Sequence, residues 1–222
     1  MSLPRTPEPK PEDPYQEAIE YQSMDHETVN RQFVIDLLTR PTGPRLIDLG
    51  CGPAGIPIEL CSQKESVEIL AIDEEPEMLD LAKREIDAAG YLERIILCQG
   101  DAHDLDWLED ATADTVISNS LIHHLASPEK GFETAVRLTK TRGRIFIRDL
   151  ARPDTVDEIE NLVQTYCKQE SVRAKQLFRQ SLHAALNLTE VREICGGLGI
   201  TSNHVQMSSD RHWTVDWEKT ID

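Results

Sequence analysis

The sequence has no long apolar run, and its basic residues are far outnumbered by acidic ones. Lys and Arg number 23 against 40 Asp and Glu among 222 residues, a formal net charge of −17. No stretch approaches the roughly 18 apolar residues that a membrane-spanning helix needs, and the N-terminus lacks the apolar core of a secretion signal. Such an acidic protein repels phosphate backbones and anionic membrane surfaces. We therefore expect a cytoplasmic protein that binds neither nucleic acid nor membranes.

The sequence also lacks paired cysteines. Its five cysteines are widely scattered, with no CxxC pair and no Cys/His cluster at zinc spacing. Reduced thiols of a cytosolic protein account for such a distribution. The cysteines therefore predict no structural disulfide and no metal site.

Short apolar segments alternate with segments of helical pattern between residues 45 and 149. Strands are expected at 45–50, 67–73, 94–101, 113–120 and 143–149, and helices at 54–64, 74–90 and 128–140. This alternation predicts an α/β fold, a Rossmann-like and mostly parallel sheet with helices on both faces. The segments HVQMS and RHWTVDW near the C-terminus predict a closing antiparallel β-hairpin, which brings the sheet to seven strands.

A glycine-rich turn follows the first expected strand. Gly50, Gly52 and Gly55 spell GxGxxG within DLGCGPAG. Glycines permit a tight turn and a close approach of a ligand to the backbone, and the N-terminus of the following helix offers free N–H groups. The pattern alone is weak, because a tight turn packed on a helix would also contain it.

Three acidic residues lie at the ends of successive strands. Asp48 precedes the glycine turn, Asp73 ends the second strand, and Asp101 ends the third. Ligands of open α/β sheets bind beyond the carboxyl ends of the strands, so we expect these carboxylates to share one mouth. There they could accept hydrogen bonds from ribose hydroxyls and from an exocyclic amine.

These motifs resemble those of the class I S-adenosylmethionine-dependent methyltransferases, particularly the small-molecule branch. The resemblance covers residues 45–150 and the topology of the closing hairpin. The matching segments are LIDLGCGPAG, AIDEEPEMLDLAK, GDAHDL, ISNSLIHHL and VRLTKTRGRIFIRD. It departs at Ala54, where the family often has a third glycine, and at residues 141–143, where Thr-Arg-Gly replaces Pro-Gly-Gly. The resemblance implies S-adenosylmethionine as methyl donor and S-adenosylhomocysteine as product.

The resemblance also implies which residues bind the cofactor. Asp48, Gly50 and Gly52 would cradle its methionine part, with Asn119 beside them. Asp73 would hold the ribose hydroxyls, and Met78 would lie against the adenine. The full predicted set is Asp48, Gly50, Cys51, Gly52, Asp73, Glu74, Met78, Asp101, Ala102 and Asn119, in which Asp101 and the backbone of Ala102 would read the adenine edge.

The organisation expected from these features is one methyltransferase domain preceded by a short arm. Residues 1–14 contain five prolines among charged residues and are expected to form a disordered or extended arm. Residues 15–222 would form the domain, divided into an N-terminal helical lid (15–43), a cofactor-binding core (44–150), a helical cover over the acceptor site (151–187) and a last helix with the hairpin (188–222).

Catalytic residues are harder to predict, because methyl transfer depends mainly on positioning. His123, His124 and Asp149 are the candidates for acid–base catalysis, although the histidines could equally pack against or cap a short helix. The candidates for acceptor binding are Tyr21, Arg148 and Arg152. Strand alternation predicts that Arg148 and Asp149 point to opposite faces.

Other functions remain open at this point. The GxGxxG pattern with Asp73 is compatible with an NAD-dependent oxidoreductase, and the same fold could bind S-adenosylmethionine without turnover or for different chemistry. The fourth strand ends in SNSL rather than in the Asn/Asp-Pro-Pro-aromatic tetrad suited to amino groups of bases. With the negative charge, this motif favours a small-molecule acceptor. We expect an enzyme that acts as a monomer or homodimer.

Overall fold

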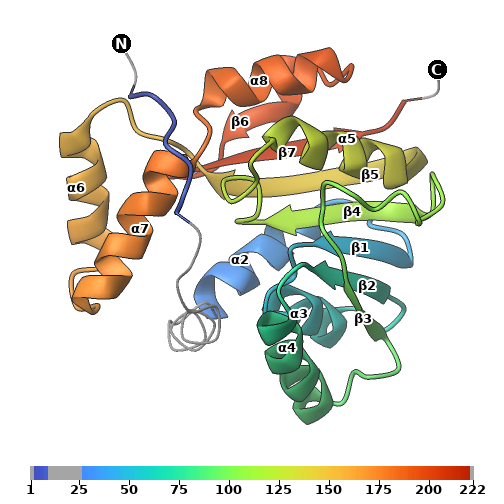
Figure 1. Ribbon diagram of the computed structural model, residues 1–222. Helices are drawn as coiled ribbons and strands as arrows, with labels where there is room; N and C mark the ends of the chain where they lie inside the picture. Colours follow the sequence, from blue (N-terminus) through green and yellow to red (C-terminus); the bar gives the residue numbers. More distant parts are fainter. Residues whose placement is uncertain (1–2, 10–26, 221–222) are drawn as a thin grey trace.

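The computed structural model describes residues 3–9 and 27–220, which form one seven-stranded sheet with helices on both faces (Figure 1). The strand order is β3-β2-β1-β4-β5-β7-β6. The strands are β1 (Arg45–Leu49), β2 (Glu68–Asp73), β3 (Ile95–Gln99), β4 (Ala113–Asn119), β5 (Thr139–Leu150), β6 (Val205–Met207) and β7 (His212–Glu218). β1 to β5 pair in parallel, whereas β7 lies antiparallel to both β5 and β6. The predicted parallel sheet with a closing hairpin is confirmed.

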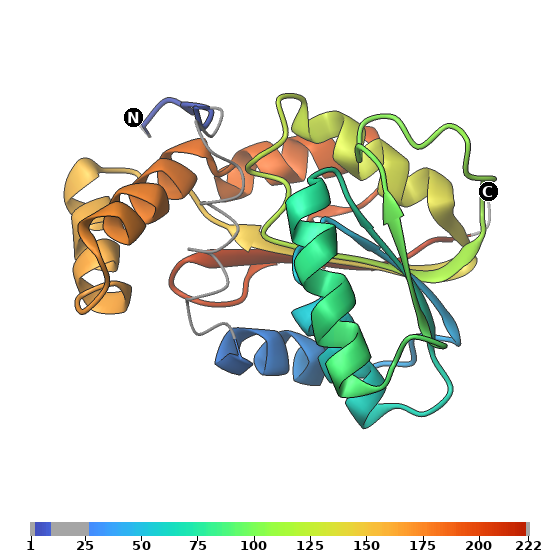
Figure 2. The same cartoon turned by 60° about the horizontal axis from the view of Figure 1, so that its bottom comes forward.

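Two layers of helices cover the sheet (Figure 2). The described helices are α2 (Glu27–Leu37), α3 (Gly55–Gln63), α4 (Pro76–Ala89), α5 (Pro128–Leu138), α6 (Val156–Tyr166), α7 (Val172–Ala184), α8 (Leu188–Gly197) and the short 3-10 helix η1 (Ser202–His204). One core joins α2, α3 and α4 to the sheet through Phe33, Leu60 and Ile86. The other joins α5 and α8 to the opposite face through Phe132 and Val191.

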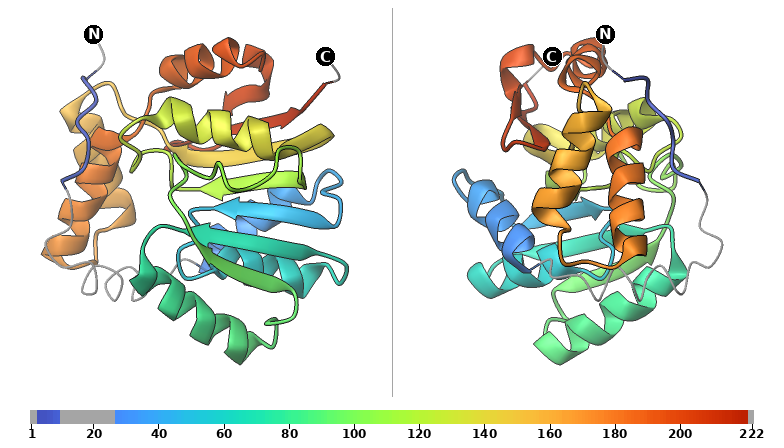
Figure 3. Two further views of the ribbon diagram at one scale, coloured as in Figure 1. Left: turned by 45° about the vertical axis from the view of Figure 1, so that its right-hand side comes forward. Right: turned by 90° about the vertical axis from the view of Figure 1, so that its left-hand side faces the viewer.

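Helices α6 and α7 stand beyond the carboxyl ends of the parallel strands (Figures 1 and 3). They form the connection between β5 and α8 and share a small core of their own, which includes Ile159, Val163 and Leu182. Their amphipathic patterns predict two helices in this region, and the structure has two. Their position makes them neighbours of any ligand bound at the strand ends.

The N-terminal segment contacts the end of α7. Residues 3–9 run alongside α7 (Figure 3), where Thr6 N donates to His183 O at 2.9 Å and the Arg5 side chain donates to Ala184 O at 2.6 Å. Residues 3–9 are therefore held against α7, in neither helix nor strand, and the bounds of the expected arm stay a prediction. The first part of the expected helical lid, residues 15–26 with Tyr21, lies outside the described residues, and α2 belongs to its remainder.

Strand β5 is longer than its apolar core suggests, because it begins at Thr139, which pairs with Ala113. A bulge follows, with Arg142 in the left-handed region at φ 64°, and pairing with β4 resumes at Arg144. Among the helices of the described ranges, none combines the length and the apolar character needed to cross a bilayer.

Candidate functional site

The glycine turn ties the end of β1 to the end of β2. The backbone N–H groups of Gly50 and Cys51 both donate to Ile72 O, at 2.8 and 3.0 Å. Gly50 has φ 70°, and a Cβ there would lie 2.7 Å from the Leu121 side chain. A side chain at this position would therefore combine left-handed strain with a steric clash. Gly52 N donates to Asp73 Oδ2 at 2.8 Å, which brings the turn against the second acidic residue.

Asp48 and Asp73 form an electrostatically unfavourable pair at this mouth. Asp48 is only 2% exposed, and no described residue hydrogen-bonds its carboxyl group. Burial and the nearby Asp73 raise the pKa of Asp48 well above its ordinary value. Burial also raises the pKa of Asp73, although N–H groups of Glu75 and Gly52 counteract part of that rise. A cationic ligand would relieve this repulsion, whereas a phosphate group would increase it.

A second polar atom near this mouth also lacks a partner. The Asn119 Oδ1 atom, at the end of β4, is buried without a hydrogen bond among the described residues, while Nδ2 donates to Ser120 Oγ at 3.2 Å. Buried acceptors are normally satisfied, so this oxygen fits a donor on a ligand. The resemblance implies that the amino-acid part of the cofactor lies beside Asn119, and the residues present fit it.

The predicted nucleoside-binding residues follow β2 and β3. Asp101 Oδ1 accepts hydrogen bonds from the backbone N and ring Nδ1 of His103, both at 2.8 Å. Burial alone would raise the pKa of Asp101, but these hydrogen bonds and the His103 charge lower it, which keeps the carboxylate ionised. Ala102 is buried beside it, Met78 is half-buried in α4 and Glu74 is exposed. Their contacts with adenine and ribose stay predictions.

Cys51 lies in the glycine turn but offers no nucleophile. Its side chain is 8% exposed, and burial together with Asp48 and Asp73 raises the pKa of its thiol far above the ordinary range. The thiol therefore stays protonated and contributes packing rather than reactivity.

His123 and Asp149 form a buried pair next to the mouth. The His123 ring Nδ1 lies 2.6 Å from Asp149 Oδ1, and the His123 backbone N donates to Oδ2 at 3.0 Å. Asp149 is fully buried, which alone would raise its pKa, but the His123 ring and the N–H groups of Leu150 and His123 lower it. Asp149 therefore orients His123 and does not itself reach a ligand.

His124 is the most accessible of the predicted catalytic residues. Its side chain is 49% exposed, its ring lies 4.0 Å from that of His123, and its Nδ1 lies 2.5 Å from Glu8 Oε2. Burial would raise the pKa of Glu8, but the hydrogen bond and charge of His124 lower it to about 2. Glu8 was not predicted as a site residue, because the composition of residues 1–14 gives no signal for it.

Arg148 belongs to the interior. It points toward α2, where its Nη2 donates to Asp36 Oδ2 at 2.7 Å and its Nε to Thr214 Oγ1 at 2.9 Å. Asp149, the next residue, points to the opposite face toward His123, as strand alternation predicts. In the free protein the Arg148 charge is paired with Asp36, and its role in acceptor binding stays a prediction.

Arg152 is likewise engaged within the protein. Its side chain is 2% exposed and donates to Leu3 O at 2.9 Å, to Ala185 O at 2.6 Å and to Glu190 at 2.5 Å. These bonds fasten the N-terminal segment and α8 to the end of α7. The role of Arg152 in acceptor binding also stays a prediction.

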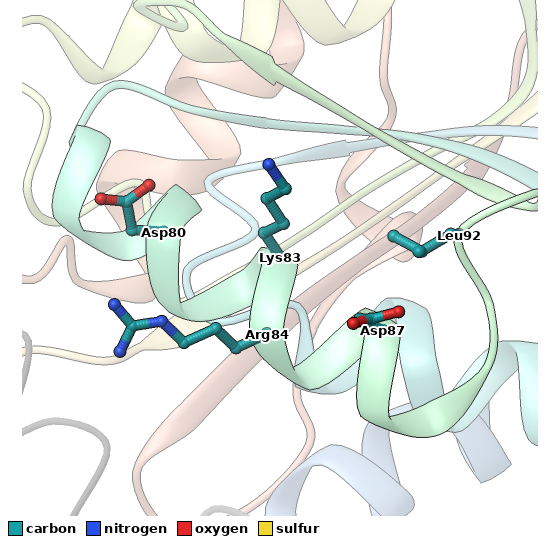
Figure 4. A pocket seen from close by; sticks show the side chains of 5 residues that line it. All are labelled: Asp80, Lys83, Arg84, Asp87 and Leu92. Atoms are coloured by element: carbon teal, nitrogen blue, oxygen red, sulfur yellow. The ribbon is translucent and has the colours of Figure 1, made fainter.

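A surface hollow elsewhere on the molecule contains none of the predicted site residues (Figure 4). It lies along the outer side of α4 and is lined by Asp80, Lys83, Arg84, Asp87 and Leu92. Four of the five are charged side chains of both signs on one helix, which is typical of a solvated helix face.

Comparisons with known proteins identify the family of this chain. A family model described as a methyltransferase domain matches residues 42–208. A ubiquinone/menaquinone biosynthesis C-methyltransferase from Geotalea daltonii is 24% identical over 124 residues, covering 55% of this chain and 52% of its own. A demethylmenaquinone methyltransferase from Desulfitobacterium hafniense is 27% identical over 124 residues, covering 55% and 49%. The chain thus spans about half the length of these curated relatives.

Solved structures share the fold at low sequence identity. A proposed S-adenosyl-L-methionine-dependent methyltransferase from Methanococcus maripaludis has a TM-score of 0.74 at 21% identity, covering 98% of both chains. Phosphoethanolamine N-methyltransferase 2 from Haemonchus contortus, solved with S-adenosyl-L-methionine, has a TM-score of 0.60 at 21% identity, covering 78% of this chain and 36% of its own. The family match over most of the chain and the strand order 3-2-1-4-5-7-6 together show that this chain belongs to the class I S-adenosylmethionine-dependent methyltransferases.

Proposed function

We propose that this protein transfers a methyl group from S-adenosylmethionine to a small-molecule acceptor. The observation that carries the proposal is the buried Asp48, which lies against Asp73 without a hydrogen-bond partner among the described residues. S-adenosylmethionine carries a sulfonium and an ammonium but no phosphate, so it supplies positive charge where the site lacks it. A dinucleotide would bring a pyrophosphate to the same acids, which disfavours the oxidoreductase alternative.

The chain's own residues would bind and orient the reactants. Asp48 and Asn119 Oδ1 would hold the amino-acid part, Asp73 would accept hydrogen bonds from the ribose, and Asp101 would hold the adenine amine. When bound, the cofactor would supply a methyl group on a sulfonium. The acceptor would attack the methyl carbon in line with the carbon–sulfur bond, and S-adenosylhomocysteine would leave. Holding two reactants in such a geometry can lower a barrier by ~7–11 kcal/mol in favourable cases.

Of the predicted catalytic residues, His124 is the one exposed enough to meet an acceptor, while His123 and Asp149 position the loop that carries it. The acceptor class follows from charge rather than from the relatives, whose printed names cover quinone carbon and phosphoethanolamine nitrogen. A net charge of −17 favours a small molecule over nucleic acid, and we propose that the protein works in the cytoplasm, as a monomer or homodimer.

Calorimetric titration with S-adenosylmethionine and S-adenosylhomocysteine tests the cofactor assignment. We expect both to bind, and Asp73→Ala to weaken binding at least tenfold, about 1.4 kcal/mol, through lost ribose hydrogen bonds. Asp87→Ala is the matched control, because Asp87 is an exposed acid on the outer side of α4 (Figure 4). Absence of binding at ~100 μM ligand, a free energy weaker than about 5.5 kcal/mol, would refute the proposal.

Turnover requires a separate experiment. Incubation with isotopically labelled cofactor and a metabolite extract, followed by mass spectrometry, should show one labelled product that depends on the protein. Cofactor binding with no labelled product from any extract would instead support the non-catalytic alternative.

A further inference from the structure

Three side chains with metal-binding atoms converge beside the cofactor mouth, outside the set assigned to the cofactor. They are Glu8 of the N-terminal segment and His123 and His124 of the loop after β4. One ligand atom from each lies within 4.8 Å of the other two. Two imidazoles and a carboxylate form a donor set that suits divalent first-row transition metals better than magnesium or calcium.

The His123 ring is held in the state that a metal ligand requires. Its Nδ1 is hydrogen-bonded to the buried Asp149 Oδ1 at 2.6 Å, and no described residue hydrogen-bonds its Nε2. Because a carboxylate accepts, Nδ1 is the donor of this bond, which leaves Nε2 as the ring nitrogen that would bind an ion. A carboxylate behind a histidine in this way orients the ring and increases its basicity as a ligand.

The Glu8 carboxylate is also held in place. Ser181 Oγ donates to Oε1 at 2.6 Å, and Oε2 faces His124 Nδ1 at 2.5 Å. Ligands about 2.0 Å from a tetrahedral ion lie roughly 3.3 Å apart, so an ion would replace the shared proton and separate this pair by somewhat under 1 Å. Side-chain rotation alone can supply that movement, because Glu8 has three rotatable bonds.

The backbone that carries Glu8 is fastened to the loop that carries both histidines. Arg5 Nη2 donates to His123 O at 3.1 Å and to Leu125 O at 2.8 Å. Hence all three ligands belong to one bonded unit, although residue 8 and residue 123 are far apart in the sequence. Such prior organisation lowers the entropic cost of ion binding.

We propose that Glu8, His123 and His124 form a binding site for one divalent transition-metal ion, with Zn²⁺ as the probe. Three protein ligands leave at least one coordination position for water or another small ligand. The site stands on these contacts whether or not the chain transfers methyl groups, and it departs from the expectation of no metal site, which rested on cysteine spacing.

The test uses the full chain without a histidine tag, freed of metal by a chelator and dialysed. We expect calorimetry to show one Zn²⁺ bound with a Kd below about 10 μM, near 7 kcal/mol. Co²⁺ should give the intense visible absorption of a site with four or five ligands. Binding should also raise the melting temperature, because the ion joins the N-terminal segment to the loop after β4.

Two variants and one control localise the ion. Glu8→Gln and His124→Ala should each weaken Zn²⁺ binding at least thirtyfold and remove the Co²⁺ absorption. His204→Ala should leave both unchanged, because His204 lies in η1 and contacts Asp216 O. Equal affinity in all four proteins, or no binding to the wild type, would overturn the site and leave an ion pair between Glu8 and His124. Cofactor titration of the same samples separates this outcome from failure of the proposed function.

Discussion

Asp48 shows how a single buried carboxyl group can be unfavourable for the free protein and useful for its ligand. Its pKa is raised by burial and by Asp73, so the folded state binds this proton more tightly than the unfolded chain does. The free energy of unfolding therefore falls as pH rises above the ordinary carboxyl pKa of 3.8. A cation bound nearby would favour the ionised form and cause proton release.

Asp48→Asn should therefore separate stability from binding. The variant lacks the deprotonation penalty, so its melting temperature should exceed that of the wild type by a margin that grows between pH 5 and pH 8. Its affinity for S-adenosylhomocysteine should fall at least tenfold, about 1.4 kcal/mol. Thermal melts and calorimetry at each pH measure both effects. An Asp48→Asn protein that melts below the wild type at pH 8 would contradict this account, and Asp87→Asn should change neither property.

Local sequence signals are enough to place some candidate site residues in the fold, but they do not reveal the partners of others. Asp48, Asp73 and Asp101 were identified because parallel strands bring their carboxyl ends to one edge, which needs no knowledge of side-chain partners. The partners of Arg148 and Arg152 lie on α2, β7, α8 and the N-terminal segment, so the sequence around each arginine holds no sign of them. Glu8 was missed for the same reason.

The N-terminal segment, residues 3–9, shows the same limit at the scale of an element. Residues 3–9 form neither helix nor strand. Two arginines that donate to backbone carbonyls hold this segment in place. Arg5, within the segment, donates to carbonyls of the loop after β4 and of the end of α7, and Arg152 donates to Leu3 O. By contrast, strongly periodic elements such as α4 and α5 follow from their own sequence.

Arg5→Ala should release this segment while the sheet stays intact. Hydrogen bonds from a charged donor each contribute about 1.5–3 kcal/mol, and Arg5 makes three of them. We expect faster amide hydrogen exchange in residues 3–9, including Thr6, and unchanged exchange in β4. Mass spectrometry of peptic fragments measures both. Arg31→Ala, which removes a surface pair with Glu27, should leave the segment protected; equal protection in Arg5→Ala would contradict the role given to Arg5.

At the scale of the whole molecule, the excess of negative charge opposes folding. With a net charge of −17, the acidic groups repel one another more strongly in the compact state than in the unfolded chain. Local ion pairs such as Arg144 with Asp216, at 2.7 Å, stabilise the folded state. Dissolved salt screens both the repulsion and these ion pairs. The balance between the two decides how the protein responds to salt.

We expect repulsion to dominate. Raising NaCl from ~10 mM to ~150 mM shortens the screening length from about 30 to about 8 Å, and should raise the melting temperature of the free protein by about 2–4 °C, near 1 kcal/mol. Scanning calorimetry at constant pH measures the shift. A melting temperature that falls over this range would show that the ion pairs contribute more than the repulsion costs.

The α6–α7 pair has a consequence for how such a protein can diversify. Its small core includes Leu150, Leu182 and Ala185 and receives Leu3 from the chain's beginning. If residues 151–187 cover the acceptor as we expect, exchanging them between homologues should alter acceptor choice and spare the cofactor half. The exchange should succeed only if residues 3–9 are exchanged as well, because Leu3 packs against the same small core. Chimaeras that exchange residues 3–9 and 151–187 together should fold, and the two segments should change together between homologues.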